Sequence, residues 1–195
     1  MIRANGLMED NMGRKYASIH IITDSKYTSR QIAHAINSAV ENIDLALVES
    51  FDAPRSPAFN VLMKMMQKMM LASKVIKENG RGYSISDGRV GMDNIADVAR
   101  ILSRFFNNDP ILYSCVHDDD IFCFGLFQNG EAISEHISGN LRPYGMEAKN
   151  EGCPGYCRIF SISASGDAAE LQTRKGVDFE EYLKEHTGID FEIVS

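Results

Sequence analysis

The sequence contains no continuous apolar run of the ~18 residues that a membrane-spanning helix needs. Residues 1–18 also lack the apolar stretch of a secretory signal, because Glu9, Asp10, Arg14 and Lys15 fall within them. Apolar residues make up 44% of the chain and charged residues 24%, which is ordinary for a globular protein and excludes a disordered chain, a collagen-like fibre and a simple coiled coil. We therefore expect a cytoplasmic protein with no membrane partner.

Familiar catalytic and cofactor-binding motifs are also missing. The chain has no GxSxG, HExxH or GxxxxGK[ST] pattern and no EF-hand spacing. We therefore predict no cofactor. Whether the chain is an enzyme stays open at this point, with the balance toward a non-enzymatic role.

Basic residues are scarce in the C-terminal part of the chain. Residues 111–195 carry 6 Lys+Arg and 15 Asp+Glu, a net charge of −9, whereas residues 1–110 have a net charge of +2. Phosphate groups would be repelled by the acidic part, so nucleic acid is not an expected partner. An acidic surface suits a basic protein or a cation, and solubility alone explains the charge equally well.

The first half of the chain shows both strand and helix periodicity. Residues 16–22 read as a strand, and Thr28 and Gln31 form a capping box for a helix that runs to about Val40. Alternating apolar residues over 43–49 predict a second strand, which gives a β-α-β opening. A long helix is predicted over 58–77, followed by a loop or small hairpin around Asp87-Gly88. Asp93 is the predicted N-cap of a helix that ends near residue 106.

The second half reads as a three-stranded meander over 111–117, 121–127 and 131–137, with Asn129-Gly130 as a hairpin turn. Residues 121–127 are apolar on both faces, which favours a central strand covered on both sides. Further strands are predicted at 156–163 and 189–194, and a helix with a capping box at Asp178–Glu181 ends near Gly188. These elements predict an α+β fold with a mixed or mainly antiparallel sheet and helices packed on one face. The chain forms a single domain, or two lobes over 1–90 and 91–195.

His117, Asp118, Asp119 and Asp120 are the first candidates for chemistry. An imidazole beside three carboxylates suits general acid–base work or a Mg²⁺ or Ca²⁺ ion, and a solvated hairpin turn is the alternative. The other histidines are His20, His34, His136 and His186. Of these, His136 lies in the meander and is expected on the same side of the sheet as His117.

The four cysteines are the second candidate set. Cys153 and Cys157 flank a Pro-Gly turn, and Cys115 and Cys123 on neighbouring strands could complete a tetrahedral metal site. The CxxxC spacing weakens this interpretation, and buried packing of Cys115 and Cys123 is the favoured alternative. Both strand cysteines are also expected to lie near His117, which allows a Cys/His pair.

The methionines of the predicted helix over 58–77 are the third set. Met side chains adapt to varied surfaces, so Met63, Met66, Met69 and Met70 are candidates for a partner interface, with burial between a sheet and a helix as the alternative.

Three functions follow from these features. The first is a non-enzymatic protein-binding module with a basic partner, for example an immunity-type protein that neutralises a basic toxin. The second is a hydrolase with a His/Asp or Cys site, with or without a metal ion. The third is a homo-oligomeric structural protein, such as a homodimer, built on the methionine helix.

Overall fold

A computed structural model describes residues 14–49, 74–106, 108–151 and 177–193. In these ranges the chain forms one sheet of seven strands, in the order β2-β3-β1-β4-β5-β6-β7, with every neighbouring pair antiparallel. The predicted α+β fold with a mainly antiparallel sheet is confirmed. The strands are β1 (Lys15–Ile22), β2 (Val75–Asn79), β3 (Gly82–Ser86), β4 (Ile111–His117), β5 (Ile121–Gln128), β6 (Glu131–Gly139) and β7 (Lys149–Glu151).

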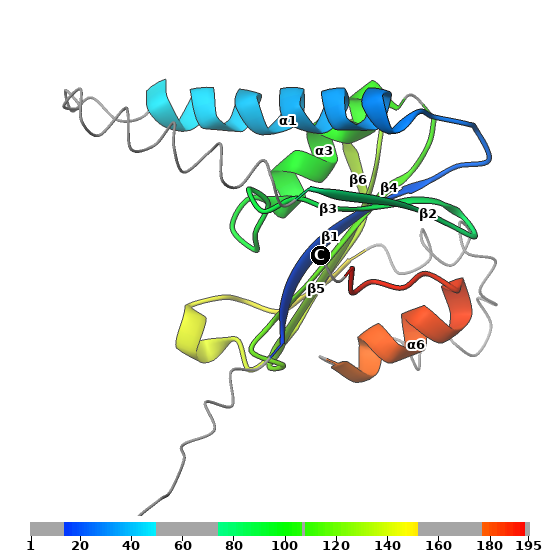
Figure 1. The fold of residues 1–195 in the computed structure, drawn as a ribbon. Helices are drawn as coiled ribbons and strands as arrows, with labels where there is room; N and C mark the ends of the chain where they lie inside the picture. The colour runs from blue at the N-terminus through cyan, green and yellow to red at the C-terminus, as the bar shows by residue number, and fades with distance from the viewer. Residues whose placement is uncertain (1–13, 50–73, 107, 152–176, 194–195) are drawn as a thin grey trace, which may run out of the picture.

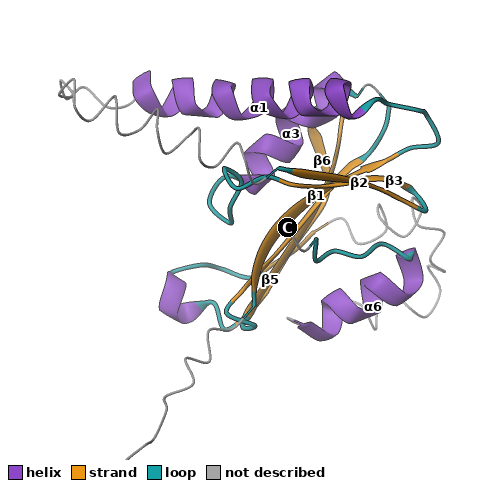
Figure 2. Cartoon of the chain, in the orientation of Figure 1, coloured by secondary structure: helices purple, strands orange, loops and turns teal. Residues whose placement is uncertain are grey.

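Both faces of the sheet are covered (Figures 1 and 2). Helices α1 (Ser29–Glu49) and α3 (Ile95–Phe105) lie together on one face, as the prediction of helices packed on one face requires. Helix α6 (Val177–Thr187) departs from that prediction, because it lies on the opposite face and buries Phe179 and Leu183 there. An extended segment over residues 188–193 follows it. A short 3-10 helix, η1 (Arg142–Tyr144), follows β6. No helix of the described ranges is both long and apolar enough to cross a bilayer.

Strand β5 lies inside the sheet and is buried on both sides, as its sequence predicted. Phe122, Phe124 and Leu126 belong to the core under α6, whereas Cys123 and Phe127 belong to the core under α1 and α3. Two hydrophobic cores therefore share this strand. The sheet also takes strands from both predicted lobes, because β1 pairs with β4.

The predicted β-α-β opening is wrong. Residues 43–49 continue α1 rather than forming a strand. The capping box at the start of this helix is confirmed, because the Gln31 amide nitrogen lies 3.3 Å from Thr28 Oγ1 and the Thr28 amide donates to Gln31 Oε1 at 2.9 Å. Ile36, Val40 and Ile43 continue one apolar face at helical spacing, and this face packs into the core.

The region between α1 and α3 also differs from its prediction. Residues 75–79 form strand β2 and not the end of a helix, and the remainder of the predicted helix lies outside the described residues. The hairpin turn falls at Gly80-Arg81, ahead of Asp87-Gly88, which makes a separate turn leading toward α3. Asn94, and not Asp93, is the N-cap residue of α3.

The meander is confirmed in its three strands and in the turn between the last two. Asn129 and Gly130 have φ values of 55° and 85°, as a tight hairpin turn between β5 and β6 requires. The strand expected at 189–194 is not part of the sheet over its described residues. Its alternation is nevertheless visible in burial, because Ile189, Phe191 and Ile193 point into the protein. The strand predicted at 156–163 lies outside the described residues.

Candidate functional site

The turn between β4 and β5 carries the predicted His/Asp cluster. Asp118 and Asp119 have φ values of 55° and 56°, a left-handed conformation that Asp tolerates better than most residues. The Asp118 carboxylate forms an ion pair with Lys15 Nζ at 2.9 Å and accepts a hydrogen bond from the Tyr144 hydroxyl at 3.0 Å. His117 Nε2 lies 3.3 Å from Asp118 Oδ2. Hydrogen bonds from Lys15 and then Tyr144 hold the pKa of Asp118 below its usual value.

Asp119 turns toward a different cation. Arg14 donates to it through its amide nitrogen at 3.0 Å and through Nε at 2.8 Å, and these hydrogen bonds lower the pKa of Asp119. The carboxylates of the turn are therefore divided between basic side chains rather than aimed at one point. Within the described residues, no group of three or more His, Cys, Asp or Glu side chains is placed to hold a metal ion.

His117 also borders a surface hollow of about 250 Å³. Its ring meets Tyr144 edge-on, with ring centroids 5.2 Å apart. An imidazole oriented by a carboxylate at the edge of a hollow can act as a general acid or base. None of the residues that line this hollow is a serine, threonine or cysteine; they are Lys15, Tyr16, Ala17, Val90, Gly91, Met92, Val116 and His117.

His136 does not share this site, which corrects the expectation that it lies on the same side of the sheet as His117. His117 pairs with Ile121 on the side of α1 and α3, whereas His136 pairs with Phe124 on the side of α6. The His136 ring is buried and stacks on Phe179 of α6, with centroids 4.0 Å apart. It packs as a core side chain under α6.

Cys115 and Cys123 are brought together as predicted. They are directly opposite each other on β4 and β5 and are 1% and 4% exposed. The hydrogen bond to Cys123, together with burial, raises the pKa of the Cys115 thiol, so this thiol stays protonated. The pair belongs to the core under α1 and α3. Cys153 and Cys157, and the interface candidates Met63, Met66, Met69 and Met70, lie outside the described residues.

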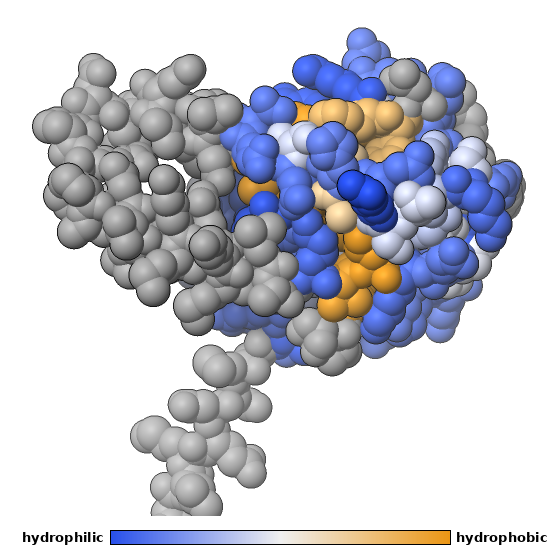
Figure 3. Space-filling view, turned by 45° about the horizontal axis from the view of Figure 1, so that its top comes forward, coloured by the Kyte–Doolittle hydropathy of each residue, from blue (hydrophilic) through white to orange (hydrophobic). Residues whose placement is uncertain are grey.

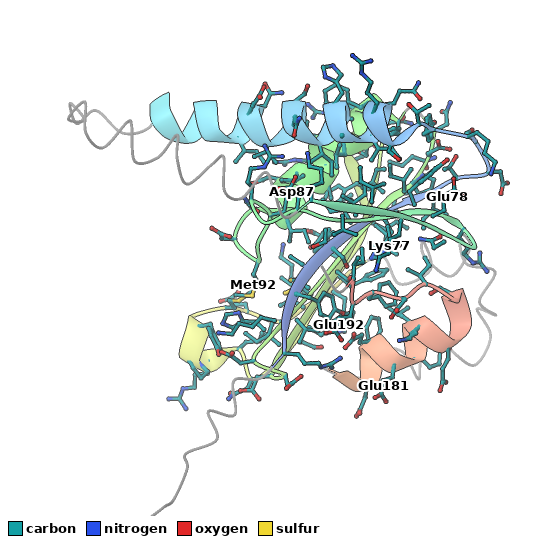
Figure 4. All side chains as sticks on the ribbon, in the orientation of Figure 1. Lys77, Glu78, Asp87, Met92, Glu181 and Glu192 are labelled. Atoms are coloured by element: carbon teal, nitrogen blue, oxygen red, sulfur yellow. The ribbon has the colours of Figure 1, made fainter. Side chains whose placement is uncertain are left out.

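The surface over α6 shows how the acidic part of the chain is displayed. Phe179 and Leu183 anchor the helix in the core, which leaves its other side toward solvent. Carboxylates of that side and of the segment after the helix form what we term the acidic face: Asp178, Glu181, Glu185, Asp190 and Glu192. Figure 4 labels Glu181 on the helix and Glu192 on the following segment.

Ion pairs hold the acidic face together. Lys184 Nζ lies 2.8 Å from Asp190, and Arg14 Nη1 lies 3.6 Å from Glu192. Asp190 and Glu192 remain 68% and 42% exposed at their side chains despite these pairs. The carboxylates therefore stay available to an incoming cation.

Sequence reasoning identified the excess of acid but not these residues. The signal was present in the spacing of Asp178, Glu181 and Glu185, which repeats at three and four positions and so places acids on one side of a helix. Glu180 breaks the pattern of exposure, because it is buried and binds Arg14 and Tyr16.

Comparison of the chain with models of protein families, with curated proteins and with solved structures gave no match. Function is therefore argued from the geometry of the sites.

Proposed function

We propose that this chain is a cytoplasmic protein-binding module whose partner presents a basic surface. The acidic face carries the proposal. Three of its carboxylates, Asp178, Glu181 and Glu185, project from a helix whose other side is anchored in the core. An immunity-type protein that neutralises a basic toxin is one role of this kind.

The charge of the surface sets how such a partner would bind. Clustered charges of one sign attract a complementary surface over several ångströms and raise the rate of association, by roughly 10- to 1000-fold at low ionic strength. On the opposite side of the sheet, the surface around α1 is mostly hydrophilic with smaller hydrophobic patches (Figure 3). The acidic face has five carboxylates against the two cations that pair with it, Lys184 and Arg14, so its charge is predominantly negative.

Capture from native cell extract at low salt tests this function. The full chain is immobilised beside a variant in which Asp178→Asn, Glu181→Gln and Glu185→Gln remove three charges from the acidic face. We expect the wild type to retain one basic protein at a stoichiometric level, identified by mass spectrometry, and the variant to retain much less of it.

A matched variant controls for net charge. Glu41→Gln, Asp93→Asn and Asp97→Asn remove the same number of charges from exposed positions of α1 and of the start of α3. This control should capture the partner as well as the wild type does. Equal capture by the wild type and the acidic-face variant, or no captured protein at low salt, would refute the proposal.

A hydrolase is the second candidate, because His117 and Asp118 lie 3.3 Å apart at the edge of a hollow. Here His117 would serve as a general base for an attacking water, with Asp118 orienting the ring. Hydrolysis of p-nitrophenyl phosphate by the wild type and its loss in His117→Gln would support this function. Equal rates in both proteins would remove it.

A further inference from the structure

A chain of hydrogen bonds passes through a second, fully buried histidine. His20 lies on β1 beneath the segment that follows α6, and the Phe191 ring meets it edge-on with centroids 5.3 Å apart. Its Nδ1 atom is 2.8 Å from Ser84 Oγ, and its Nε2 atom is 3.0 Å from Ser18 Oγ. The imidazole therefore bridges two serines that come from different strands.

The partners of Ser18 decide where the protons lie. Ser18 donates its only hydroxyl proton to the carbonyl oxygen of Phe191, at 2.6 Å, because a carbonyl can only accept. His20 Nε2 must then carry a proton and donate it to Ser18. Burial lowers the pKa of His20 to about 3, so the ring is neutral and has a single N–H group. Nδ1 is consequently an acceptor, and Ser84 donates its hydroxyl proton to it.

Ser84 also borders a hollow at the protein surface. It lies at a hollow of about 100 Å³ between the β2–β3 hairpin and the segment after α6, although it is only 4% exposed. Asn79 Nδ2 donates to Ser84 Oγ at 2.5 Å from the same hollow. Figure 4 labels three of the lining residues, Lys77, Glu78 and Glu192, and the others are Asn79, Ser84, Asp190 and Ile193.

We propose that Ser84 is a nucleophile activated by His20, and that the hollow takes the short acyl group of a neutral or cationic ester. A serine hydroxyl that donates to an unprotonated imidazole nitrogen is the resting arrangement of serine–histidine catalysis. The size of the hollow limits the acyl group. The carboxylates of Glu78, Asp190 and Glu192 disfavour an anionic one.

The reaction would proceed in two balanced steps. Ser84 Oγ attacks the ester carbonyl carbon while its proton passes to His20 Nδ1, and the alcohol leaves with that proton, so Ser84 becomes acylated. Water then attacks the acyl group and gives one proton to His20. The carboxylic acid leaves, and the proton returns from His20 to Ser84. Asp190 favours the transient imidazolium electrostatically, and the Asn79 amide is a donor close to the carbonyl oxygen. This activity does not depend on the proposed partner binding.

Covalent labelling of the full chain with methanesulfonyl fluoride tests the proposal. The reagent is small, and a serine that attacks it releases fluoride and keeps the sulfonyl group. We expect one label per chain, mapped to Ser84 by peptide mass spectrometry, and p-nitrophenyl acetate hydrolysis that the label abolishes. Ser84→Ala should abolish both the label and the hydrolysis of p-nitrophenyl acetate. His20→Gln should slow labelling of Ser84 by about 100-fold or more, which is the usual contribution of a general base.

Ser103→Ala is the matched control, because Ser103 is another buried serine but lies on α3, where its hydroxyl donates to the carbonyl oxygen of Arg100 and has no hydrogen bond to His20, Ser18 or Ser84. It should label at the wild-type rate. Labelling of the wild type in urea distinguishes a folded site from an ordinary hydroxyl even where a variant does not fold. The proposal would be overturned if Ser84 carried no label in the folded wild type. It would also be overturned if Ser84 of the wild type were labelled in urea as fast as in the folded protein, or if folded His20→Gln were labelled as fast as the wild type.

Discussion

Arg14 Nη2 donates to the Glu180 carboxylate at 3.1 Å, which ties the start of β1 to the helix near the end of the chain. Tyr16 donates its hydroxyl to the other oxygen of Glu180 at 2.7 Å. Glu180 has a side chain that is only 7% exposed, so its charge is compensated within the protein. Arg14 also contacts Asp119 and Glu192, and it therefore joins the β4–β5 turn, α6 and the segment that follows.

Replacing Glu180 with alanine should destabilise the protein. The change leaves the half-buried Tyr16 hydroxyl without this acceptor and removes one partner of Arg14, for an expected loss of about 1–3 kcal/mol in the free energy of unfolding. Urea denaturation followed by circular dichroism measures this loss. Glu181→Ala, one residue along and exposed, is the matched control and should stay within about 0.5 kcal/mol of the wild type. Similar losses in both variants would show that the Glu180 contacts are not what stabilises α6.

A buried ion-pair network makes a second contribution to stability. The Asp87 side chain is only 1% exposed. Its carboxylate accepts hydrogen bonds from Arg89 Nε at 2.9 Å and Arg89 Nη2 at 2.7 Å, and it forms an ion pair with Lys74 Nζ at 3.3 Å. Both cations also donate to Asn37 of α1, so the network connects α1 to the chain after β3. Burial alone would raise the pKa of Asp87, but the hydrogen bonds from Arg89 outweigh burial and the net shift is downward.

This lowered pKa predicts an acid-sensitive contribution. A carboxyl group whose pKa is lower in the folded state stabilises that state above its ordinary value of about 4, and the contribution is lost as the pH falls through the folded-state pKa. Asp87→Asn should therefore cost roughly 3 kcal/mol at pH 7, because it leaves buried cations without their counter-ion. The difference from the wild type should narrow below about pH 4.

Urea midpoints of wild type and Asp87→Asn, measured from pH 7 down to pH 3, check this prediction. Asp97→Asn is the control, since its side chain is 52% exposed and pairs with Arg100 on the surface. An exposed pair of this kind is worth at most about 1 kcal/mol. A difference in urea midpoint between wild type and Asp87→Asn that stays constant from pH 7 to pH 3 would contradict the predicted contribution of this network.

Gly125 is expected to be intolerant of any side chain. A Cβ atom at this position would overlap Cε1 of Tyr113, whose ring covers the glycine from the neighbouring strand. Gly125→Ala should lower the free energy of unfolding by about 1–3 kcal/mol, since the buried ring must move. Gly80→Ala is the control, because no atom lies within 4 Å of its added Cβ. Equal unfolding midpoints for the two variants would mean that the ring moves without cost.

How well the sequence predicted each feature depended on how far apart in the chain the residues that determine it lie. Two local signals, the capping box at Thr28 and the turn at Asn129-Gly130, are confirmed and depend on neighbouring residues alone. Two other local signals missed their position, because Asn94 and not Asp93 caps α3, and α6 begins before Asp178. The prediction for 43–49 failed because Ile43 fits two periods, alternating with Leu45 and Leu47 as in a strand and continuing the helical face of Ile36 and Val40. The helical period is the one that the chain adopts here, and the Asn42 side chain accordingly donates to the carbonyl oxygen of Ser38, one helical turn earlier.

The sites depended on contacts that no local signal reports. His20 and Ser84 are 64 positions apart in the chain and meet because β1 pairs with β3. Nothing in the residues around either one marks this contact. The excess of acid in residues 111–195 was visible in composition, but the exposure of Asp178, Glu181 and Glu185 on one side of α6 depends on the helix burying its other side. Composition could predict the sign of the surface and not its location.

The most direct test of the proposed function is the rate of association with the captured basic partner at increasing ionic strength. For the wild type we predict a rate constant that falls roughly tenfold or more between low salt and physiological salt, because salt screens attraction between surfaces. The variant with Asp178→Asn, Glu181→Gln and Glu185→Gln should start from a lower rate and depend less on salt. Identical rates and salt dependence in the two proteins would contradict docking on the acidic face.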